Sequence, residues 1–322
     1  MDSLIYLTDS LMEIGPCSAD IDFDTGHPDK STNDFLMHGV LPEDVGGIYV
    51  PGTEFGGLIE YIQTRNTSEV VTNKGYTWRG LLAQGVIEPP SGENYKIVSG
   101  DANAVIRSLL SSFLGGLFYV PEESSGITVT NYQFARYCTI LDGLTDMLAN
   151  HGAKLVVKAD KLSAGAPVRV QVSAAPIVTI GDKYSEEYPV DMTYTENSMG
   201  ITHLICLGQG ELKDRTRIDL YVGANGEIAD TPYYTGLKAR TALYDYSSAQ
   251  SESELRKYGI RRLNELKPGK TIGINDAEVD GDVGDKVYGY MNGVSTTVTI
   301  VQKILTISGG IWTYESKIEG DT

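Results

Sequence analysis

The stretch that most constrains the fold is residues 271–320, close to the C-terminus. It contains three runs rich in Val, Ile, Thr and Tyr, a composition typical of β-strands: 285–291, 294–305 and 311–318. Asn292-Gly293 separates the first two runs, and this dipeptide favours a tight turn with positive φ. Gly309-Gly310 separates the last two. The sequence therefore predicts a compact antiparallel unit without a catalytic-looking side chain, which suggests a structural building block.

The first 90 residues are also predicted to be mostly β. Asn73-Lys74-Gly75 lies between two strand-like runs, 69–72 and 76–82, and is a second hairpin signal. Residues 20–47 are acidic and contain Gly and Pro, so we interpret them as an exposed loop around a short apolar stretch. Pro89-Pro90 cannot continue a strand ladder, and we place the end of this β part there.

The sequence predicts three helices, each with its own N-terminal cap. The first two belong to an α+β module at 91–175, and the third follows a return to strand-like runs. Their ranges and caps are 102–114 after Asp101, 140–150 after Thr139, and Ser251 to Pro268-Gly269, where Ser251 and Glu254 form a capping box. The fold class is therefore α+β, mostly β.

The composition excludes several classes of function. The chain has 322 residues, 41% of them hydrophobic and 21% charged, which is ordinary for a globular protein, and its net charge is −17. This charge argues against sequence-specific nucleic-acid binding and against adhesion to an anionic membrane. No run reaches the roughly 18 apolar residues of a membrane span, and the N-terminus lacks a basic start. We expect synthesis in a cytoplasm and no stable membrane insertion.

The chain shows no motif for a catalytic, cofactor or metal site. Asp276, Glu278, Asp280 and Asp282 match the early positions of an EF-hand loop, but the twelfth position is Val287, where a Glu is required. Asp20, Asp22 and Asp24 fail the same test. His203 and Cys206 are three residues apart in a strand run, so they face opposite sides of a sheet. We expect no cofactor, no metal and no enzyme activity, and the three cysteines are interpreted as free thiols.

Several segments together resemble the Gp37-like tail proteins of siphoviruses and prophages, within the wider group of baseplate hub, or tail-associated, proteins. The resemblance covers about residues 45–320, and the order of the segments carries it. They are 76–82 (YTWRGLL) with 87–90, 98–103 (VSGDAN), 131–137 (NYQFARY), 202–212 (THLICLGQGEL) with Arg215 and 219–221, and 283–287 with 298–304.

The resemblance implies two tail-tube-type β-barrels with inserted α/β modules. It also implies a homotrimeric ring that matches a sixfold tail tube to a threefold tip and continues the tube lumen. We assign the first barrel to 1–90 plus about 176–235, the inserted module to 91–175, a connecting segment with a helix to 236–270, and the second barrel to 271–322. An acidic lumen along which DNA slides is a further hypothesis.

The partners implied by the resemblance are those of a virion tail assembled in the bacterial cytoplasm. They are the tail tube or distal tail ring, a tape measure protein in the lumen, and a spike, fibre or receptor-binding protein at the tip. The chain ends soon after the hub region, so we expect a separate tip protein and transfer no lytic activity.

Subunit contacts are expected at strand edges whose backbone groups are otherwise open. The residues predicted there are Tyr76, Trp78, Val298, Thr299, Gln302 and Lys303. Two alternative functions stay open. One is a tail-associated cell-wall hydrolase, and the other is a glycan-binding, adhesin-like β protein that uses aromatic residues such as Trp78 and Trp312.

Overall fold

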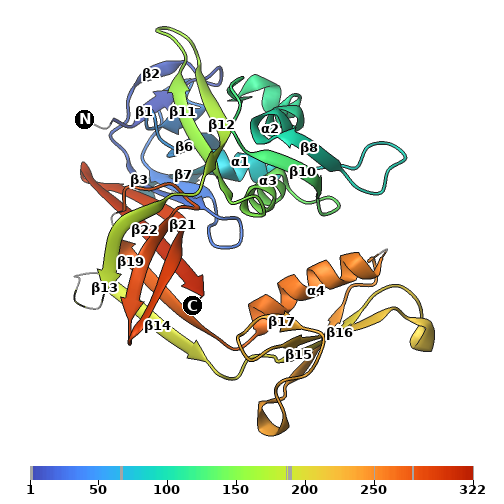
Figure 1. Ribbon diagram of the computed structural model, residues 1–322. Coiled ribbons are helices and arrows are strands. Elements are labelled where there is room, and N and C mark those ends of the chain that lie inside the picture. Colours follow the sequence, from blue (N-terminus) through green and yellow to red (C-terminus); the bar gives the residue numbers. More distant parts are fainter. Residues whose placement is uncertain are drawn as a thin grey trace. The chain divides into compact units, whose positions relative to one another are not determined.

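The computed structural model describes residues 3–65, 68–185, 187, 191–249, 251–277 and 279–321. The fold is α+β and mostly β, as predicted (Figure 1). The described part has four α-helices, and none of them is long and apolar enough to cross a membrane. The chain forms two compact units. Unit 1 comprises Met1–Met192, Gly273–Tyr290 and Thr297–Gly320, and unit 2 comprises Thr193–Ile272, Met291–Thr296 and Asp321–Thr322.

The helices are α1 (Trp78–Gln84), α2 (Ala102–Leu110), α3 (Ile140–Ala149) and α4 (Glu252–Leu266). The strands of the N-terminal part are β1 (Ile5–Leu7), β2 (Glu13–Pro16), β3 (Asp20–Gly26), β4 (Asp34–His38), β5 (Gly47–Tyr49), β6 (Gly56–Arg65) and β7 (Ser68–Thr77). Those of the middle part are β8 (Ile97–Asp101), β9 (Phe118–Tyr119), β10 (Thr128–Gln133), β11 (Ala153–Lys161), β12 (Val168–Pro176) and β13 (Thr179–Ser185). The remaining strands are β14 (Asp191–Asn197), β15 (His203–Leu207), β16 (Arg217–Val222), β17 (Ile228–Ala229), β18 (Thr241–Asp245), β19 (Gly269–Ala277), β20 (Lys286–Met291), β21 (Val294–Ser308) and β22 (Ile311–Asp321).

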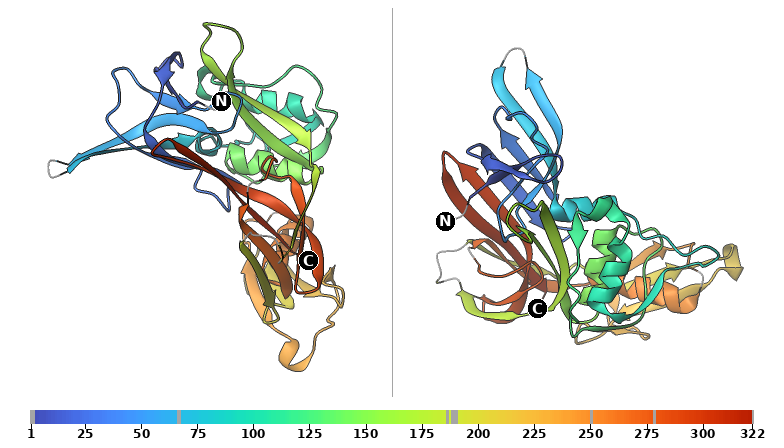
Figure 2. Two further views of the ribbon diagram at one scale, coloured as in Figure 1. Left: turned by 90° about the vertical axis from the view of Figure 1, so that its left-hand side faces the viewer. Right: turned by 90° about the horizontal axis from the view of Figure 1, so that it is seen from above.

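Unit 1 is built on one curled sheet whose strands come from both ends of the chain. Its order is β19-β22-β21-β3-β4-β7-β6-β5-β1-β2, and β20 pairs with β21 while β13 pairs with β20. Strands β6 and β7 form a long hairpin that extends beyond their neighbours (Figure 2). The strand order of the described residues does not return to its start, so the sheet is open in this part of the chain.

Strand β21 belongs to both halves of this sheet. It pairs with β20 and β22 from the C-terminal part, and residues Gln302–Ile307 also pair with β3 from the N-terminal part. The register with β22 shifts between Ile300 and Gln302, which marks a β-bulge. Gly26 of β3 lies against the bulge, because a Cβ there would be 2.4 Å from the Val301 carbonyl oxygen. The two halves are thus one continuous sheet within the chain.

Two large apolar cores among the described residues help to support unit 1. The first lies between the curled sheet's inner strands and is built mainly from β3, β4, β5 and β21; it includes Phe23, Phe35 and Leu305. The second joins helices α1, α2 and α3 to the sheet β11-β12-β9, and Trp78 and Tyr49 are part of it. Both contain residues with no exposed surface, so each fixes the elements around it by burial of apolar area.

Unit 2 is a four-stranded sheet with one helix. The strand order is β17-β16-β15-β18, and α4 lies along one face (Figure 1). Buried and partly exposed residues alternate along β15, so the side chains of Leu204 and Cys206 point toward the helix. Gly259 of α4 permits this approach, because a Cβ there would lie 2.6 Å from the Cys206 sulfur.

The local signals for helix starts are confirmed. Asp101 accepts hydrogen bonds from the first turn of α2, and Thr139 does so for α3. Ser251 accepts one from the Glu254 N–H at the start of α4. The turn at Asn292-Gly293 also has the predicted positive φ at both residues, and it joins β20 to β21.

Three local predictions are wrong. Residues 76–82 are not one strand, because Thr77 caps a helix that begins at Trp78. Asn73-Lys74-Gly75 is not a turn but lies inside β7, where Gly75 lets the backbone of β6 approach closely: a Cβ would be 1.8 Å from the Leu58 carbonyl oxygen. Residues 20–47 are not one exposed loop, because they contain β3 and β4.

Residues 176–235 contribute strands to both units. Strand β13 pairs with β20, whereas β15, β16 and β17 pair with one another in unit 2. Within unit 1, a hydrogen bond joins the starts of β13 and β20. The Val178 N–H, just before β13, donates to the carboxylate of Asp285, just before β20. This contact links two segments that are far apart in the sequence.

Candidate functional site

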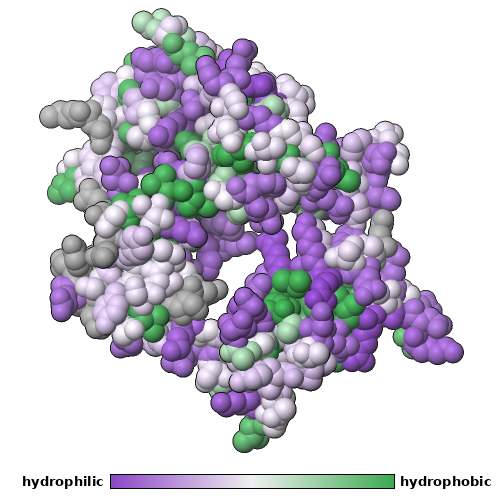
Figure 3. Space-filling view, viewed as in Figure 1, coloured by the Kyte–Doolittle hydropathy of each residue, from purple (hydrophilic) through white to green (hydrophobic). Residues whose placement is uncertain are grey.

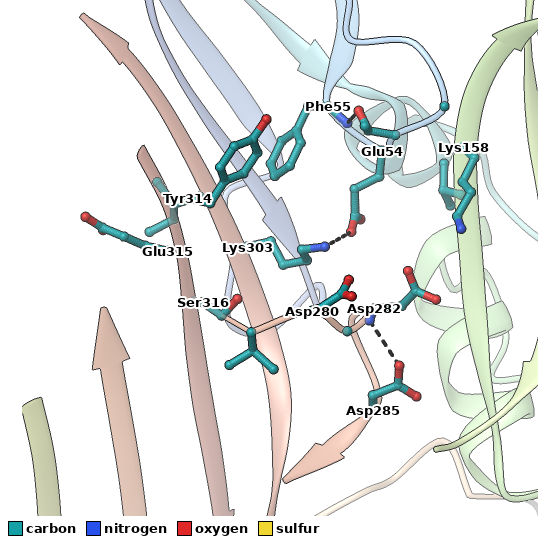
Figure 4. Close-up of a pocket in the computed structure, with 16 residues that line it drawn as sticks. Glu54, Phe55, Lys158, Asp280, Asp282, Asp285, Lys303, Tyr314, Glu315 and Ser316 are labelled. Carbon is teal, nitrogen blue, oxygen red and sulfur yellow. Dashed lines mark hydrogen bonds and ion pairs between the residues drawn. The ribbon is translucent and has the colours of Figure 1, made fainter. Parts of the chain in front are cut away.

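One candidate site is an open cavity of about 700 Å³ in unit 1 (Figure 4). Segments from three parts of the sequence line it: the loop before β6, strand β11, and the region from 279 to 316 with β21 and β22. Its charged side chains come from five carboxylates and two lysines: Glu54, Asp280, Asp282, Asp285, Glu315, Lys158 and Lys303. Phe55 and Tyr314 add an aromatic wall, with ring centroids 5.9 Å apart.

A buried ion-pair cluster closes one side of this cavity. Lys154 of β11 has a side chain that is only 6% exposed, and its Nζ lies 2.8 Å from Asp282 and 2.5 Å from Asp285. Asp285 also accepts hydrogen bonds from the N–H groups of Val178 and Asp282. Because a buried carboxylate needs compensating partners, these contacts hold β11, β13 and the loop before β20 together.

A second buried pair lies on the other side. Arg79 of α1 donates from Nε to Glu54 at 2.8 Å and from Nη2 to the Leu155 carbonyl oxygen at 2.9 Å. Lys303 of β21 approaches the other oxygen of Glu54 at 3.7 Å. Both clusters therefore involve β11, and each ties it to a different half of the curled sheet.

The arrangement fits a structural junction better than a reaction centre. Glu54, Asp282 and Asp285 are each held by a cation, so they are not placed to accept a substrate proton. Among the described residues, no group of three or more His, Cys, Asp or Glu side chains could hold a metal ion. Asp280 lies in the cavity without an ion pair to any described residue, whereas the Glu315 carboxylate points away from the other labelled side chains (Figure 4).

The structure separates His203 from Cys206, as predicted. Cys206 is buried under α4, where burial raises its pKa to about 11. His203 lies on the opposite face, stacked on Tyr221, with its ring nitrogens 2.7 Å from Asp219 and 3.0 Å from the Thr241 hydroxyl. This chain of hydrogen bonds lies on the sheet face opposite α4, and its residues do not line the unit 1 cavity.

The aromatic residues considered for glycan binding lie in cores. Trp78 is fully buried at the start of α1, and Trp312 is partly buried against the core of β3, β4 and β21. Asp20, Asp22 and Asp24 alternate along strand β3 rather than forming a calcium loop. Glu278, from the EF-hand comparison, lies outside the described residues.

The residues predicted at the C-terminal subunit edge lie in β21. Thr299 pairs with β22, and Gln302 and Lys303 pair with β22 on one side and β3 on the other. Val298 and Gln302 are buried within the chain. The backbone of Gln302 and Lys303 is therefore not an open strand edge. Strand β3 of the same chain occupies the position at which a second subunit was expected to pair.

The residues predicted at the N-terminal edge also have intrachain partners. Tyr76 pairs with Asp34 of β4 and Leu58 of β6, so β7 is a central strand, although the Tyr76 side chain stays exposed. Trp78 is buried in the core of α1, α2 and α3. The sequence did contain a signal for the helix that carries Trp78, because Thr77 directly before it is a possible helix cap.

Acidification is expected to destabilise unit 1 below about pH 4. Burial raises the pKa of Asp282, but hydrogen bonding and charge from Lys154 lower it more, so its pKa lies below the ordinary value. Hydrogen bonds from Lys161 and Tyr49 likewise lower the pKa of Glu13. Carboxylates with lowered pKa values stabilise the fold above their unfolded pKa, and this contribution is lost as the pH falls through the folded pKa.

Thermal melts followed by tryptophan fluorescence at pH 7, 5, 4 and 3 test this, because both tryptophans lie in unit 1. Asp282→Asn is the matched variant, and its melting temperature should depend less on pH than that of the unchanged chain. Equal pH dependence in the two proteins would contradict the assignment.

The fold is shared with phage tail and baseplate proteins of known structure. The 43 kDa tail protein of prophage MuSo2 from Shewanella oneidensis superposes with a TM-score of 0.57 at 11% identity, covering 99% of this chain and 98% of that one. A tail protein from Neisseria meningitidis gives 0.56 at 13% identity, covering 99% and 96%. A chain of the p2 virion baseplate in its activated conformation gives 0.53 at 13%, covering 100% and 99%.

These likenesses extend over nearly the whole length of each chain, so they include both units rather than one common module. At such identities they show a common fold. No protein-family model matches the chain, and no curated protein sequence matches it.

Proposed function

We propose that this chain is a structural component of a phage tail or phage-tail-like particle, acting as the baseplate or tail-tip hub. The observation that carries the proposal is the end-to-end likeness in fold to tail and baseplate proteins. The cavity in unit 1 supports the proposal, because its buried charged side chains form ion pairs that join different segments of the chain. A Gp37-like relationship within the hub group is part of the same proposal.

The proposed mechanism is symmetry matching by a homotrimeric ring. Each chain contributes two tube-like half-barrels, so that three chains present six similar faces to the tail tube. We infer that one half-barrel comes from the strands of 1–90 and the other from β13, β19, β20, β21 and β22. The shared strand β21 would hold the two in a fixed relation, which a ring with regular faces requires.

The acidic outer side of β3 supports the proposed lumen. Asp20 and Asp22 alternate with buried residues on this strand, so their carboxylates point away from the core. Asp24 accepts hydrogen bonds from Ser31, Thr32 and Gln302, and Asp20 accepts one from the Gly309 N–H. A lumen lined by the carboxylates of β3 would repel DNA and let it slide.

The proposed partners are the tail tube or distal tail ring, a tape measure protein in the lumen, and a spike, fibre or receptor-binding protein at the tip. Assembly would occur in the bacterial cytoplasm. Of the predicted subunit contacts, Tyr76, Thr299 and Lys303 keep some exposed surface and remain candidates. Trp78 and Val298 would act only by supporting the strands.

Light scattering of the purified chain at micromolar concentration tests the proposal. We expect a mass near three times 34.9 kDa, followed by rings in electron microscopy. If the chain is monomeric alone but trimeric with the tube protein, assembly is templated. A monomer under both conditions would contradict the hub.

Zymography on peptidoglycan tests the hydrolase alternative. We expect no cleared band, because the proposed role is structural.

A further inference from the structure

A cavity of about 280 Å³ lies in unit 2, near the points where the chain enters and leaves this unit. The three segments that line it are 196–202, 234–238 and 268–270. The Ile201 N–H donates to the Leu266 carbonyl oxygen at 2.7 Å. A Cβ on Gly200 would lie 2.2 Å from the Pro268 nitrogen, so the first and third segments are in close contact. Backbone contacts therefore fix two walls of the cavity.

The third wall carries Lys238, which lies on a loop that is held at its base. Figure 3 shows the loop 231–240 at the bottom of the view, with hydrophilic residues beside an apolar tip. The tip residue Leu237 is 95% exposed, so burial does not hold this part of the loop. The buried Thr202 hydroxyl donates to the Lys238 carbonyl oxygen at 3.1 Å and accepts the Arg240 N–H at 2.9 Å. These bonds tie the backbone of Lys238 to the first segment.

Positive charge collects at this cavity although the protein is acidic. Lys238 and Lys270 line it, and Glu196, 4.0 Å from Lys270, is the one carboxylate among the described lining residues. Lys238 makes no ion pair with a described residue, and the neighbouring Arg240 donates to the Ser198 carbonyl oxygen. Other cations of unit 2 pair with carboxylates instead: Arg215, Arg217, Arg256 and Arg262. The cations at the cavity therefore outnumber its carboxylate, which favours an anionic ligand.

Two neutral hydrogen-bond donors also line the cavity. The Tyr234 side chain packs in part on the core of unit 2, and its hydroxyl has no hydrogen-bond partner among the described residues. The side-chain oxygen of Asn197 accepts the Met199 N–H at 3.0 Å, so its amide nitrogen is left to donate. Two ammonium groups and two neutral donors exceed what a singly charged carboxylate requires. They match a phosphate group, which has three terminal oxygens and a charge of about −1.5 to −2 at pH 7.

We propose that this cavity binds a phosphate group, as free phosphate or as a small phosphate monoester. Lys238 and Lys270 would supply the positive charge, and Tyr234 and Asn197 would hydrogen-bond the remaining oxygens. The volume of about 280 Å³ leaves room for the organic part of a monoester. The inference is independent of the proposed hub, because every lining residue belongs to unit 2.

Isothermal titration calorimetry of the full-length chain with sodium phosphate tests the site. At constant ionic strength in chloride, we expect saturable binding to one site per chain. Lys238→Met should raise the dissociation constant about 10-fold, as the loss of one charge-assisted hydrogen bond does. Lys213→Met is the matched control, because it removes the same charge from another exposed loop of unit 2 and should leave the affinity unchanged. Absence of binding, or an equal loss of affinity in the two variants, would overturn the site.

Glu196→Gln distinguishes a binding role of the cavity from a structural one. Removing this carboxylate lowers the repulsion of the bound anion, so phosphate should bind about 3-fold more tightly. Unchanged or weaker affinity would contradict the placement of the ligand.

Other anions identify the ligand. Acetate should bind at least about 10-fold more weakly than phosphate, and equal affinity would overturn the assignment to phosphate. Titration with glycerol phosphate distinguishes the two sources: binding tighter than that of inorganic phosphate indicates a monoester, and weaker binding indicates free phosphate.

Discussion

Replacing Lys154 with Met is expected to lower the free energy of unfolding of unit 1 by about 3–5 kcal/mol. The substitution keeps most of the apolar stem and removes the ammonium group that lies between Asp282 and Asp285. Asp285 is only 5% exposed, so its carboxylate would remain buried without a cation. An uncompensated buried charge costs far more than the net value of the pair.

Urea unfolding followed by tryptophan fluorescence measures this effect, because Trp78 and Trp312 are the chain's two tryptophans and both lie in unit 1. Lys30→Met is the matched control. It breaks the exposed pair of Lys30 with Glu319, at 47% and 41% exposure, and should cost less than about 1 kcal/mol.

A second variant distinguishes charge from packing. Lys154→Met with Asp285→Asn removes both charges while the amide oxygen can still accept the Val178 N–H. It should recover part of the lost stability. If Lys154→Met costs no more than Lys30→Met, the buried cluster does not hold β11 to the C-terminal part of the sheet.

Replacing Phe23 with Ala is expected to cost unit 1 about 3–5 kcal/mol as well. Phe23 is fully buried, and its ring centroid lies 5.5 Å from that of Phe35 and 6.0 Å from that of Phe55. Its backbone pairs with Leu305 of β21 and with Phe35 of β4. The residue thus sits where the N-terminal strands meet the shared strand, and truncation leaves a cavity at that point.

Tyr61→Ala is the control for this variant. Tyr61 is half exposed on the long β6–β7 hairpin, so its loss should change the free energy of unfolding by no more than about 0.5 kcal/mol. Urea unfolding of both variants compares them directly. An equal, small effect at both positions would mean that the N-terminal strands are not packed on β21.

Local signals in the sequence were sufficient for three of the four described helices, α2, α3 and α4, and for some turns. Asp101, Thr139 and Ser251 each cap the helix that they were predicted to cap, because capping involves only the next three residues. Asn292-Gly293 makes its turn because both residues adopt positive φ at low cost. The mostly β composition also followed from the strand-like runs.

Strand β3 was missed although its signal was present. Asp20, Asp22 and Asp24 alternate with Ile21 and Phe23, which is the period of a half-buried strand. The segment was interpreted as a loop because it is highly charged. The segment forms a strand because Phe23 is buried against Phe35. The free energy gained by burying this aromatic area exceeds the small cost of placing aspartates, which have low β propensity, in a strand.

The sequence by itself determined where α2, α3 and α4 begin, where the last hairpins turn, and that the chain is a β-rich protein with a strong acidic excess. The tertiary structure alone decided that β21 joins the two ends of the chain in one sheet, that Lys154 lies between Asp282 and Asp285, and that Leu237 remains exposed. The physical reason is range. Caps and turns depend on a few consecutive residues, whereas strand partners and buried ion pairs depend on contacts between residues far apart in the sequence. The hydrogen bond from the Gly309 N–H to Asp20 spans 289 positions.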